Sequence, residues 1–202
     1  MRWLPRFSSP AGSGAAALVI VLAVMLTGCG INTIPTKEET AKAAWSEVQN
    51  QYQRRADLIP NLVNTVKGYA TQEQTVLTEV TQARAKATQV QVNANQLTDP
   101  EAIRRFQEAQ AQLSGSLGRL LAISEQYPDL KSNQNFLALQ SQLEGTENRI
   151  TVARRDYISA VQDFNTEVRT FPGRLWAGMY GAKPMAAFTT TEQNQSAPSV
   201  KF

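Results

Sequence analysis

Histidine is absent from this 202-residue chain, and its absence excludes several kinds of site at once. The chain has no imidazole to act as a general acid or base, to activate a serine or cysteine nucleophile, or to hold a metal ion. Cysteine occurs only as Cys29, so neither an intrachain disulfide nor a cluster of thiolate metal ligands can form. We therefore expect no cofactor and no enzymatic activity.

Charged and aromatic residues are also scarce. The net charge of +3 includes Arg2 and Arg6, which lie in an N-terminal segment that we expect to be removed. Subtracting these two charges leaves +1, which is too small to predict nucleic acid as a partner. Aromatic residues make up 7% of the chain, so we expect a core built mainly from aliphatic side chains and alanine.

Residues 1–28 have the pattern of a lipoprotein-type signal peptide. After the two arginines, residues 15–26 form an apolar run of about 12 residues, whereas a membrane-spanning helix needs about 20. The run leads into Leu26-Thr27-Gly28-Cys29, which resembles the lipobox at which bacterial lipoproteins are cut and acylated. We predict lipidation of Cys29, followed by a tether over residues 29–35.

The predicted lipid would attach the protein to a membrane on the extracytoplasmic side, in the cell envelope. Several acyl chains, at ~0.8 kcal/mol per buried CH₂, hold a protein firmly, whereas one chain is marginal. Two alternatives stay open: a plain signal peptide, or an uncleaved anchor starting near Phe7, with Cys29 an incidental small residue.

The longest periodic stretch covers residues 133–171. Apolar or small residues recur there every three or four positions, which predicts one long helix with a single buried seam. The seam consists of Phe136, Leu139, Leu143, Thr146, Ile150, Ala153, Tyr157, Ala160, Phe164, Val168 and Phe171. Ordering such a helix costs roughly 1.5 kcal/mol per residue, so one seam cannot hold it alone and other helices must cover it.

Three further helices are predicted, which makes the fold class all-α, an antiparallel four-helix bundle over residues 36–172. The four helices cover residues 36–70, 71–96, 99–127 and 133–171. Pro60 either ends the first helix near Leu58 or kinks it. A kink at Pro60 with a turn near Ala70 to Thr71 gives first and second helices whose lengths match those of the later helices better, so we favour this alternative. Capping-box patterns at residues 36–39 and 71–74, and Pro100 after Asp99, mark expected helix starts.

The C-terminal part contains two segments of different composition. Residues 173–181 include Leu175, Trp176, Met179 and Tyr180, so we expect this segment to pack on the bundle or on a membrane. Residues 182–202 are rich in Thr, Gln, Asn, Ser and Ala without a period, and we expect them to be disordered.

The carboxylates of the fourth helix have no catalytic spacing. Glu144, Glu147, Asp156 and Asp163 are expected to pair with Arg149, Arg154 and Arg155. A di-metal bundle would also need histidines, although a metal-dependent hydrolase using carboxylates alone stays open as an alternative. The small residues of the second and third helices, with Gly115 and Gly118, leave open close helix packing or a cavity of a small-ligand or lipid carrier.

One cluster of polar residues stands out in the first helix. Pro60 frees the carbonyl of Ala56. Asn61, Asp57 or an arginine could satisfy this carbonyl or bridge to the fourth helix. Alternatively, the kink forms a surface that docks a protein partner. The candidate partner surface consists of Arg54, Arg55, Asp57, Pro60, Asn61, Tyr127, Asp129 and Lys131.

Over residues 36–172 the sequence resembles the LemA family of bacterial envelope proteins. The resemblance is carried by residues 54–63 (RRADLIPNLV), 65–69 (TVKGY), 83–84 (AR), 127–131 (YPDLK), 143–150 (LEGTENRI), 153–157 (ARRDY), Asn165 and 171–172 (FP). It implies an antiparallel four-helix bundle beside a membrane, without an established enzymatic activity. Our own hypothesis for the function is a membrane-anchored scaffold of the cell envelope that offers its surface to protein partners such as stress or quality-control factors.

Two departures from the family pattern matter. Relatives commonly have histidine where this chain has Ala56 and Gln72, so no shared histidine chemistry is expected here. Relatives also commonly begin with a membrane-spanning helix, whereas this chain begins with the lipobox-like segment.

Overall fold

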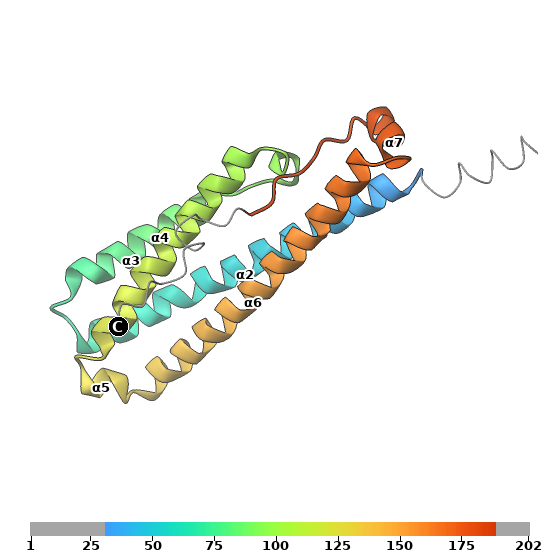
Figure 1. Cartoon of the computed structure of the whole chain (residues 1–202). Helices are drawn as coiled ribbons and strands as arrows, with labels where there is room; N and C mark the ends of the chain where they lie inside the picture. Colours follow the sequence, from blue (N-terminus) through green and yellow to red (C-terminus); the bar gives the residue numbers. More distant parts are fainter. Residues whose placement is uncertain (1–30, 189–202) are drawn as a thin grey trace, which may run out of the picture.

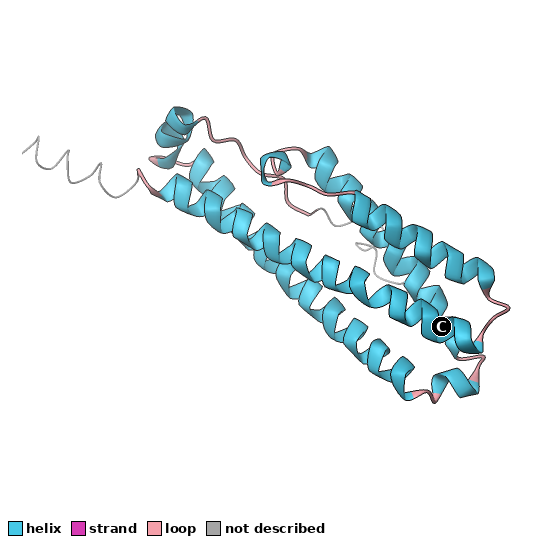
Figure 2. Cartoon of the chain, turned by 180° about the vertical axis from the view of Figure 1, so that it is seen from behind, coloured by secondary structure: helices cyan, strands magenta, loops and turns pink. Residues whose placement is uncertain are grey.

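The computed structural model describes residues 31–188, and its regular elements are all helices (Figures 1 and 2). In chain order they are α2 (Thr33–Tyr69), α3 (Gln74–Gln89), a 3₁₀ turn η1 (Ala94–Gln96), α4 (Pro100–Ser124), α5 (Pro128–Lys131), α6 (Gln134–Arg169) and α7 (Gly173–Tyr180). Within this described range no strand occurs, so the all-α class is confirmed. The predicted signal peptide and Cys29 lie outside the described residues.

The main helices form two antiparallel pairs of unequal length. The long helices α2 and α6 lie against each other, α3 and α4 form a shorter pair, and α3 packs on α2 (Figure 1). The backbones of α4 and α6, by contrast, stay apart for most of their length. An evenly closed bundle of four similar helices is therefore not confirmed.

Helix α2 runs without a break through Pro60, which excludes the predicted alternative of an end near Leu58. The chain turns after Tyr69, as predicted, but neither expected capping box forms. Residues 36–39 lie inside α2, which begins at Thr33 because Ile34 is fully buried and extends the packed face. At α3 the side chain of Gln74 donates instead to the carbonyl of Thr71, at 3.0 Å.

Helix α3 ends at Gln89, earlier than the predicted Gln96. The chain then turns inward at Val92, which is 1% exposed. Its carbonyl accepts hydrogen bonds from Trp45 Nε1 at 2.9 Å and Gln49 Nε2 at 3.2 Å. These two contacts from α2 stabilise a non-helical backbone after Gln89. The small, periodic residues of this segment predict instead that the helix continues.

The starts of α4 and α6 agree with the sequence. Asp99 caps α4 by accepting from the Glu101 N–H at 2.9 Å, with Pro100 at the first helical position. Asn133 caps α6 by accepting from the Phe136 N–H at 3.0 Å. Both caps satisfy backbone donors that a helix start otherwise leaves without partners.

Residues 182–188 are packed in an extended conformation, so the prediction of disorder from residue 182 onward is wrong for this segment. Asn165 pairs with the backbone of Met185 through two hydrogen bonds of 2.8 Å. The Tyr157 hydroxyl donates to the carbonyl of Ala186 at 2.7 Å, and burial raises the pKa of this hydroxyl. Side chains of α6 thus supply the hydrogen-bond partners for this backbone that a neighbouring strand supplies in a sheet. Residues 189–202 lie outside the described range.

The core divides along the rod into two clusters of buried side chains. The aromatic cluster, toward α7, contains Trp45, Tyr52, Phe106, Tyr157, Phe164 and Phe188 among its members. The aliphatic cluster, toward α5, contains Ile59, Leu62, Val66, Leu113, Leu117, Leu120 and Leu143 among its members. Trp45 lies 5.1 Å from Tyr157 and 5.2 Å from Phe106 between ring centroids. Most members of both clusters are aliphatic side chains or alanine, as expected, although the first cluster gathers six aromatic side chains.

Candidate functional site

The predicted partner surface on α2 divides into an exposed part and a buried residue. Arg54, Asp57, Pro60 and Asn61 are exposed, whereas Arg55 is only 1% exposed. Arg55 follows Tyr52 by three residues on the inward face of the helix. It is therefore not part of any docking surface, and its assignment to that surface is corrected.

The guanidinium of Arg55 connects three helices. Its Nη1 donates to Glu147 Oε1 of α6 at 2.7 Å and to Ser114 Oγ of α4 at 2.8 Å. Its Nη2 donates to the Gln110 side chain at 2.7 Å and to the Gln110 carbonyl at 3.3 Å. Arg55 Nε is buried and has no hydrogen-bond partner among the described residues. The charge is thus compensated at one end of the guanidinium by a half-exposed carboxylate.

Helix α3 joins the same level of the rod through two contacts. Pro60 has no N–H, so the carbonyl of Ala56 lacks its usual helical partner. Arg84 Nε of α3 donates to this carbonyl at 2.7 Å, which confirms that an arginine satisfies it. Gln110 Nε2 donates to the Ala87 carbonyl at 3.3 Å, so all four main helices meet at this level.

These contacts form a polar layer between the two core clusters, which we call the Arg55 layer. It consists of Arg55, Arg84, Gln110, Ser114 and Glu147. On one side the Arg55 guanidinium lies over the Tyr52 ring, 4.9 Å from its centroid, and on the other side the aliphatic cluster begins at Ile59. Each contact can form only when the two helices that it joins are aligned at the same level along the rod. The layer therefore sets the axial register of the helices.

The acidic residues of α6 mostly do not pair with the arginines predicted for them. Glu147 pairs with Arg55 instead, because the long Arg55 side chain reaches across the core. Arg149 donates to Gln51 at 3.2 Å, and Arg154 lies over an aromatic ring. The predicted pairing holds only for the exposed residues Arg155 and Asp156, at 3.7 Å. Within residues 31–188, no three acidic or cysteine side chains gather where a metal ion could bind.

The second part of the predicted partner surface lies at the α5 end. The Tyr127 hydroxyl donates to Glu73 at 3.0 Å, which raises the pKa of Tyr127. Asp129 is exposed, and Lys131 forms an ion pair with Glu125. Asn133, at this end of the rod, donates to the Tyr69 hydroxyl of α2. Tyr69 follows Arg54 by 15 residues, which corresponds to about 22 Å along the helix. The two parts of the predicted surface are therefore separate patches.

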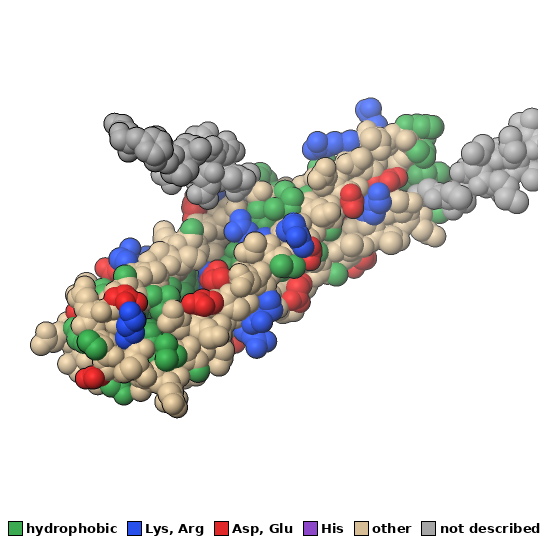
Figure 3. Space-filling model, turned by 60° about the horizontal axis from the view of Figure 1, so that its bottom comes forward, with side chains coloured by type: hydrophobic (Ala, Val, Ile, Leu, Met, Phe, Trp, Pro, Cys, Tyr) green, Lys and Arg blue, Asp and Glu red, His purple; other side chains and the backbone are tan. Residues whose placement is uncertain are grey.

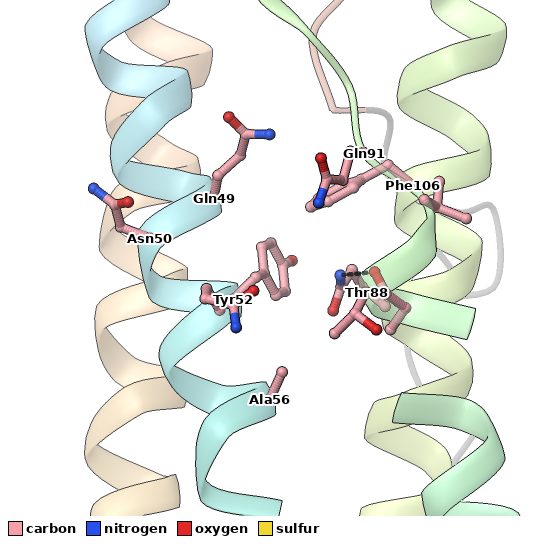
Figure 4. Close-up of a pocket in the computed structure, with 11 residues that line it drawn as sticks. Gln49, Asn50, Tyr52, Ala56, Thr88, Gln91 and Phe106 are labelled. Carbon is pink, nitrogen blue, oxygen red and sulfur yellow. Dashed lines mark hydrogen bonds between the residues drawn. The ribbon is translucent and has the colours of Figure 1, made fainter. Parts of the chain in front are cut away.

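Two openings flank the Arg55 layer. A pocket of about 230 Å³ lies between α2 and the end of α3, where Gln49 and Tyr52 face Thr88 and Gln91 (Figure 4). A larger groove of about 540 Å³ lies between α4 and α6 and is lined by Ser114, Leu117, Gly118, Leu121, Leu143, Glu144, Glu147 and Asn148. A Cβ at Gly115 or Gly118 would meet no atom within 4 Å, so these glycines border open space rather than close helix packing.

Helix α7 packs on the bundle with only one face. Gly173 and Ala177 are buried against it, while four large apolar side chains stay exposed. Their exposed fractions are 82% for Phe171, 61% for Leu175, 75% for Met179 and 50% for Tyr180. Over residues 31–188, no helix combines the length and the hydropathy that crossing a membrane requires.

Comparison with known proteins gives one family. A model described as LemA family matches residues 44–202. Magnetosome protein MamQ 2 of Paramagnetospirillum magneticum is 26% identical over 168 residues, covering 75% of this chain and 62% of that protein. Protein LemA of Metamycoplasma hominis is 26% identical over 140 residues, covering 69% of this chain and 60% of that protein. The chain thus spans less than two thirds of the length of these curated relatives.

Proposed function

This chain belongs to the LemA family, and on that premise we propose that it is a membrane-anchored, non-catalytic scaffold of the cell envelope. The observation that supports a scaffold most directly is the Arg55 layer. Its arginines, amide, hydroxyl and carboxylate bind one another and backbone carbonyls across four helices. Apart from Arg55 Nε, the polar groups buried in this layer form contacts that hold the helices together, as expected of a structural element rather than a reaction centre.

The proposed attachment is a lipid on Cys29, on the extracytoplasmic side. Helix α2 begins at Thr33, four residues after Cys29, so the helical rod would start close to the lipid. Among the relatives, the name "magnetosome protein" associates MamQ with a membrane-bounded organelle, which supports a membrane location.

The attachment is tested by metabolic palmitate labelling of the full chain in bacterial cells. We expect the parent chain to carry label and the Cys29→Ala variant to carry none. Ser13→Ala, a substitution in the segment that would be removed, serves as the matched control and should label like the parent. Equal labelling of the parent and Cys29→Ala, or no labelling of the parent, contradicts the lipid anchor.

The proposed partners are envelope proteins, with stress or quality-control factors as the expected class. Two separate patches are available to them: the exposed residues Arg54, Asp57, Pro60 and Asn61 on α2, and the partly buried Tyr127 with the exposed Asp129 and Lys131 at the α5 end. A photo-crosslinking residue at Arg54 should capture a defined protein in cells. The same residue at Arg105, an exposed arginine on α4, should not capture it. Identical captured proteins at both positions contradict a specific patch.

A second candidate function, a carrier of a small apolar ligand or lipid, is favoured by the groove between α4 and α6. Its volume of about 540 Å³ falls within the usual range of ligand sites, and its leucines suit an apolar ligand. Native mass spectrometry of the purified chain would show a bound molecule of defined mass. No comparable cluster within the described range favours the metal-dependent hydrolase, which stoichiometric metal in elemental analysis would revive.

A further inference from the structure

The exposed side of α7 carries several large apolar side chains. Leu175 and Met179 lie one turn apart, Phe171 precedes the helix and Tyr180 ends it, and all four are at least half exposed. Figure 3 shows hydrophobic side chains gathered at the end of the rod that carries α7. Large apolar side chains that cluster on a surface usually mark a contact with another molecule or with a membrane.

The charged residues of the α7 segment itself have one sign. Residues 170–188 contain no aspartate or glutamate, whereas Arg174 and Lys183 are both exposed. The nearest acidic residue before them, Glu167, is paired with Lys37 at 3.0 Å. An apolar face flanked by cations is the pattern of a helix that lies in a membrane interface, where the cations meet anionic headgroups.

The position of α7 in the chain connects this face to the proposed anchor. Ala177, on the packed face of α7, belongs to the same buried cluster as Ile34, and α7 lies beside the start of α2 in both views (Figures 1 and 2). Ile34 follows Cys29 by five residues, a distance of at most about 18 Å along an extended chain. A lipid on Cys29 would therefore hold the α7 end of the rod at the membrane surface.

We propose that the exposed face of α7 inserts into the headgroup region of the membrane beside the lipid on Cys29. Phe171, Leu175 and Met179 enter the boundary with the acyl chains, and Arg174 and Lys183 contact anionic headgroups. Two points of attachment, the lipid and the helix, restrict the tilt of the rod, which one flexible tether would not do. This inference rests on the proposed lipid anchor at Cys29.

The test uses the full lipidated chain, bound to vesicles of phosphatidylethanolamine and phosphatidylglycerol, with a polarity-sensitive fluorophore on Met179→Cys. An acylated Cys29 has no free thiol, so the parent chain should not label. The matched control is Leu137→Cys on α6, an apolar residue that is 47% exposed but lies at the α5 end. At an insertion depth of roughly 5–10 Å, brominated acyl chains should quench more than about half of the fluorescence at position 179 and little at position 137.

A second variant separates insertion from mere proximity. Phe171→Ser together with Leu175→Ser should reduce the quenching at position 179, while Leu137→Ser should leave it unchanged. All three side chains are exposed, so thermal unfolding of the variants should match the parent.

The other results overturn the inference in distinguishable ways. If the chain floats with the vesicles but position 179 is as unquenched as position 137, the anchor stands and insertion is wrong. If the fluorophore at position 179 is shielded from water but not quenched by brominated lipid, and if this shielding increases with protein concentration, α7 binds a second copy of the chain instead. A chain that does not float contradicts the anchor and this inference with it.

Discussion

The core cluster toward α7 contains six aromatic side chains among its aliphatic ones, whereas the cluster toward α5 contains one, Phe136. The aromatic half is covered by α7 and by residues 182–188, which contribute Met185 and Phe188 to its core. The aliphatic half is covered by the short helix α5, which contributes Leu130, and the groove between α4 and α6 opens along it. The same two long helices thus support an end covered by α7 and residues 182–188 near the proposed membrane and an end with a groove away from it, with the Arg55 layer between them.

The largest expected effect on stability comes from disrupting the Arg55 layer, which lies between the two halves. Arg55→Ala should lower the free energy of unfolding by about 3–4 kcal/mol, because it leaves a cavity and removes the partner of buried polar groups. Urea denaturation measures this change. Arg54→Ala, the exposed neighbour, should change stability by less than about 0.5 kcal/mol. Similar losses for both variants would contradict a buried Arg55.

The cover of the aromatic half is tested by Phe188→Ala. Phe188 lies 5.5 Å from Tyr157 and 5.8 Å from Trp45 between ring centroids, and it is 8% exposed. Removing its ring should cost about 2–3 kcal/mol of unfolding free energy in the same assay. Lys183→Ala, exposed in the same segment, is the control. A Phe188→Ala chain as stable as the control would show that this segment does not complete the core.

A double-mutant cycle tests the link between α2 and α3 within the layer. Arg84→Met leaves the Ala56 carbonyl without its donor and should cost about 1–2 kcal/mol. In a Pro60→Ala background the restored N–H of residue 60 can donate to that carbonyl, so the same change should cost about 1 kcal/mol less. Additive costs in chemical denaturation would argue against the Arg84 contact.

The smallest expected effect sharpens the contrast between the half with the groove and the half under α7. A Cβ at Gly118 would meet nothing within 4 Å, so Gly118→Ala should raise the melting temperature through about 0.5–1 kcal/mol of helix propensity. Gly173, under α7, is the opposite case, because an added Cβ would lie 2.3 Å from the Glu167 carbonyl oxygen. Gly173→Ala should therefore lower the melting temperature. A drop for Gly118→Ala would indicate that the groove is filled.

The sequence predicted the positions of the helices better than their caps or the site. Asp99 caps α4 through a short-range contact, which a local pattern contains, whereas neither expected capping box formed. Arg55 was misplaced because two adjacent arginines look alike in the sequence, although its spacing from Tyr52 and Ile59 put it on the buried seam. Its partners on α4 and α6 lie 55 to 92 residues away, and no local pattern contains them.

The extended segment was missed for a related reason. Residues 182–188 have no period of their own, and their order depends on hydrogen bonds from Asn165 and Tyr157 of α6. Composition reports only what a segment can bury by itself. It does not report what a distant helix can supply to it.

The orientation of the rod on the membrane tests the account most directly. Energy transfer from a dye in the vesicle surface can be measured to labels on Gly178→Cys of α7 and Ser132→Cys near α5, in the full lipidated chain. Helix α6, with 36 residues, is about 54 Å long, so the label at position 178 should show strong transfer and the label at position 132 weak transfer. Equal transfer at both positions, or stronger transfer at position 132, would contradict a rod that stands on its α7 end.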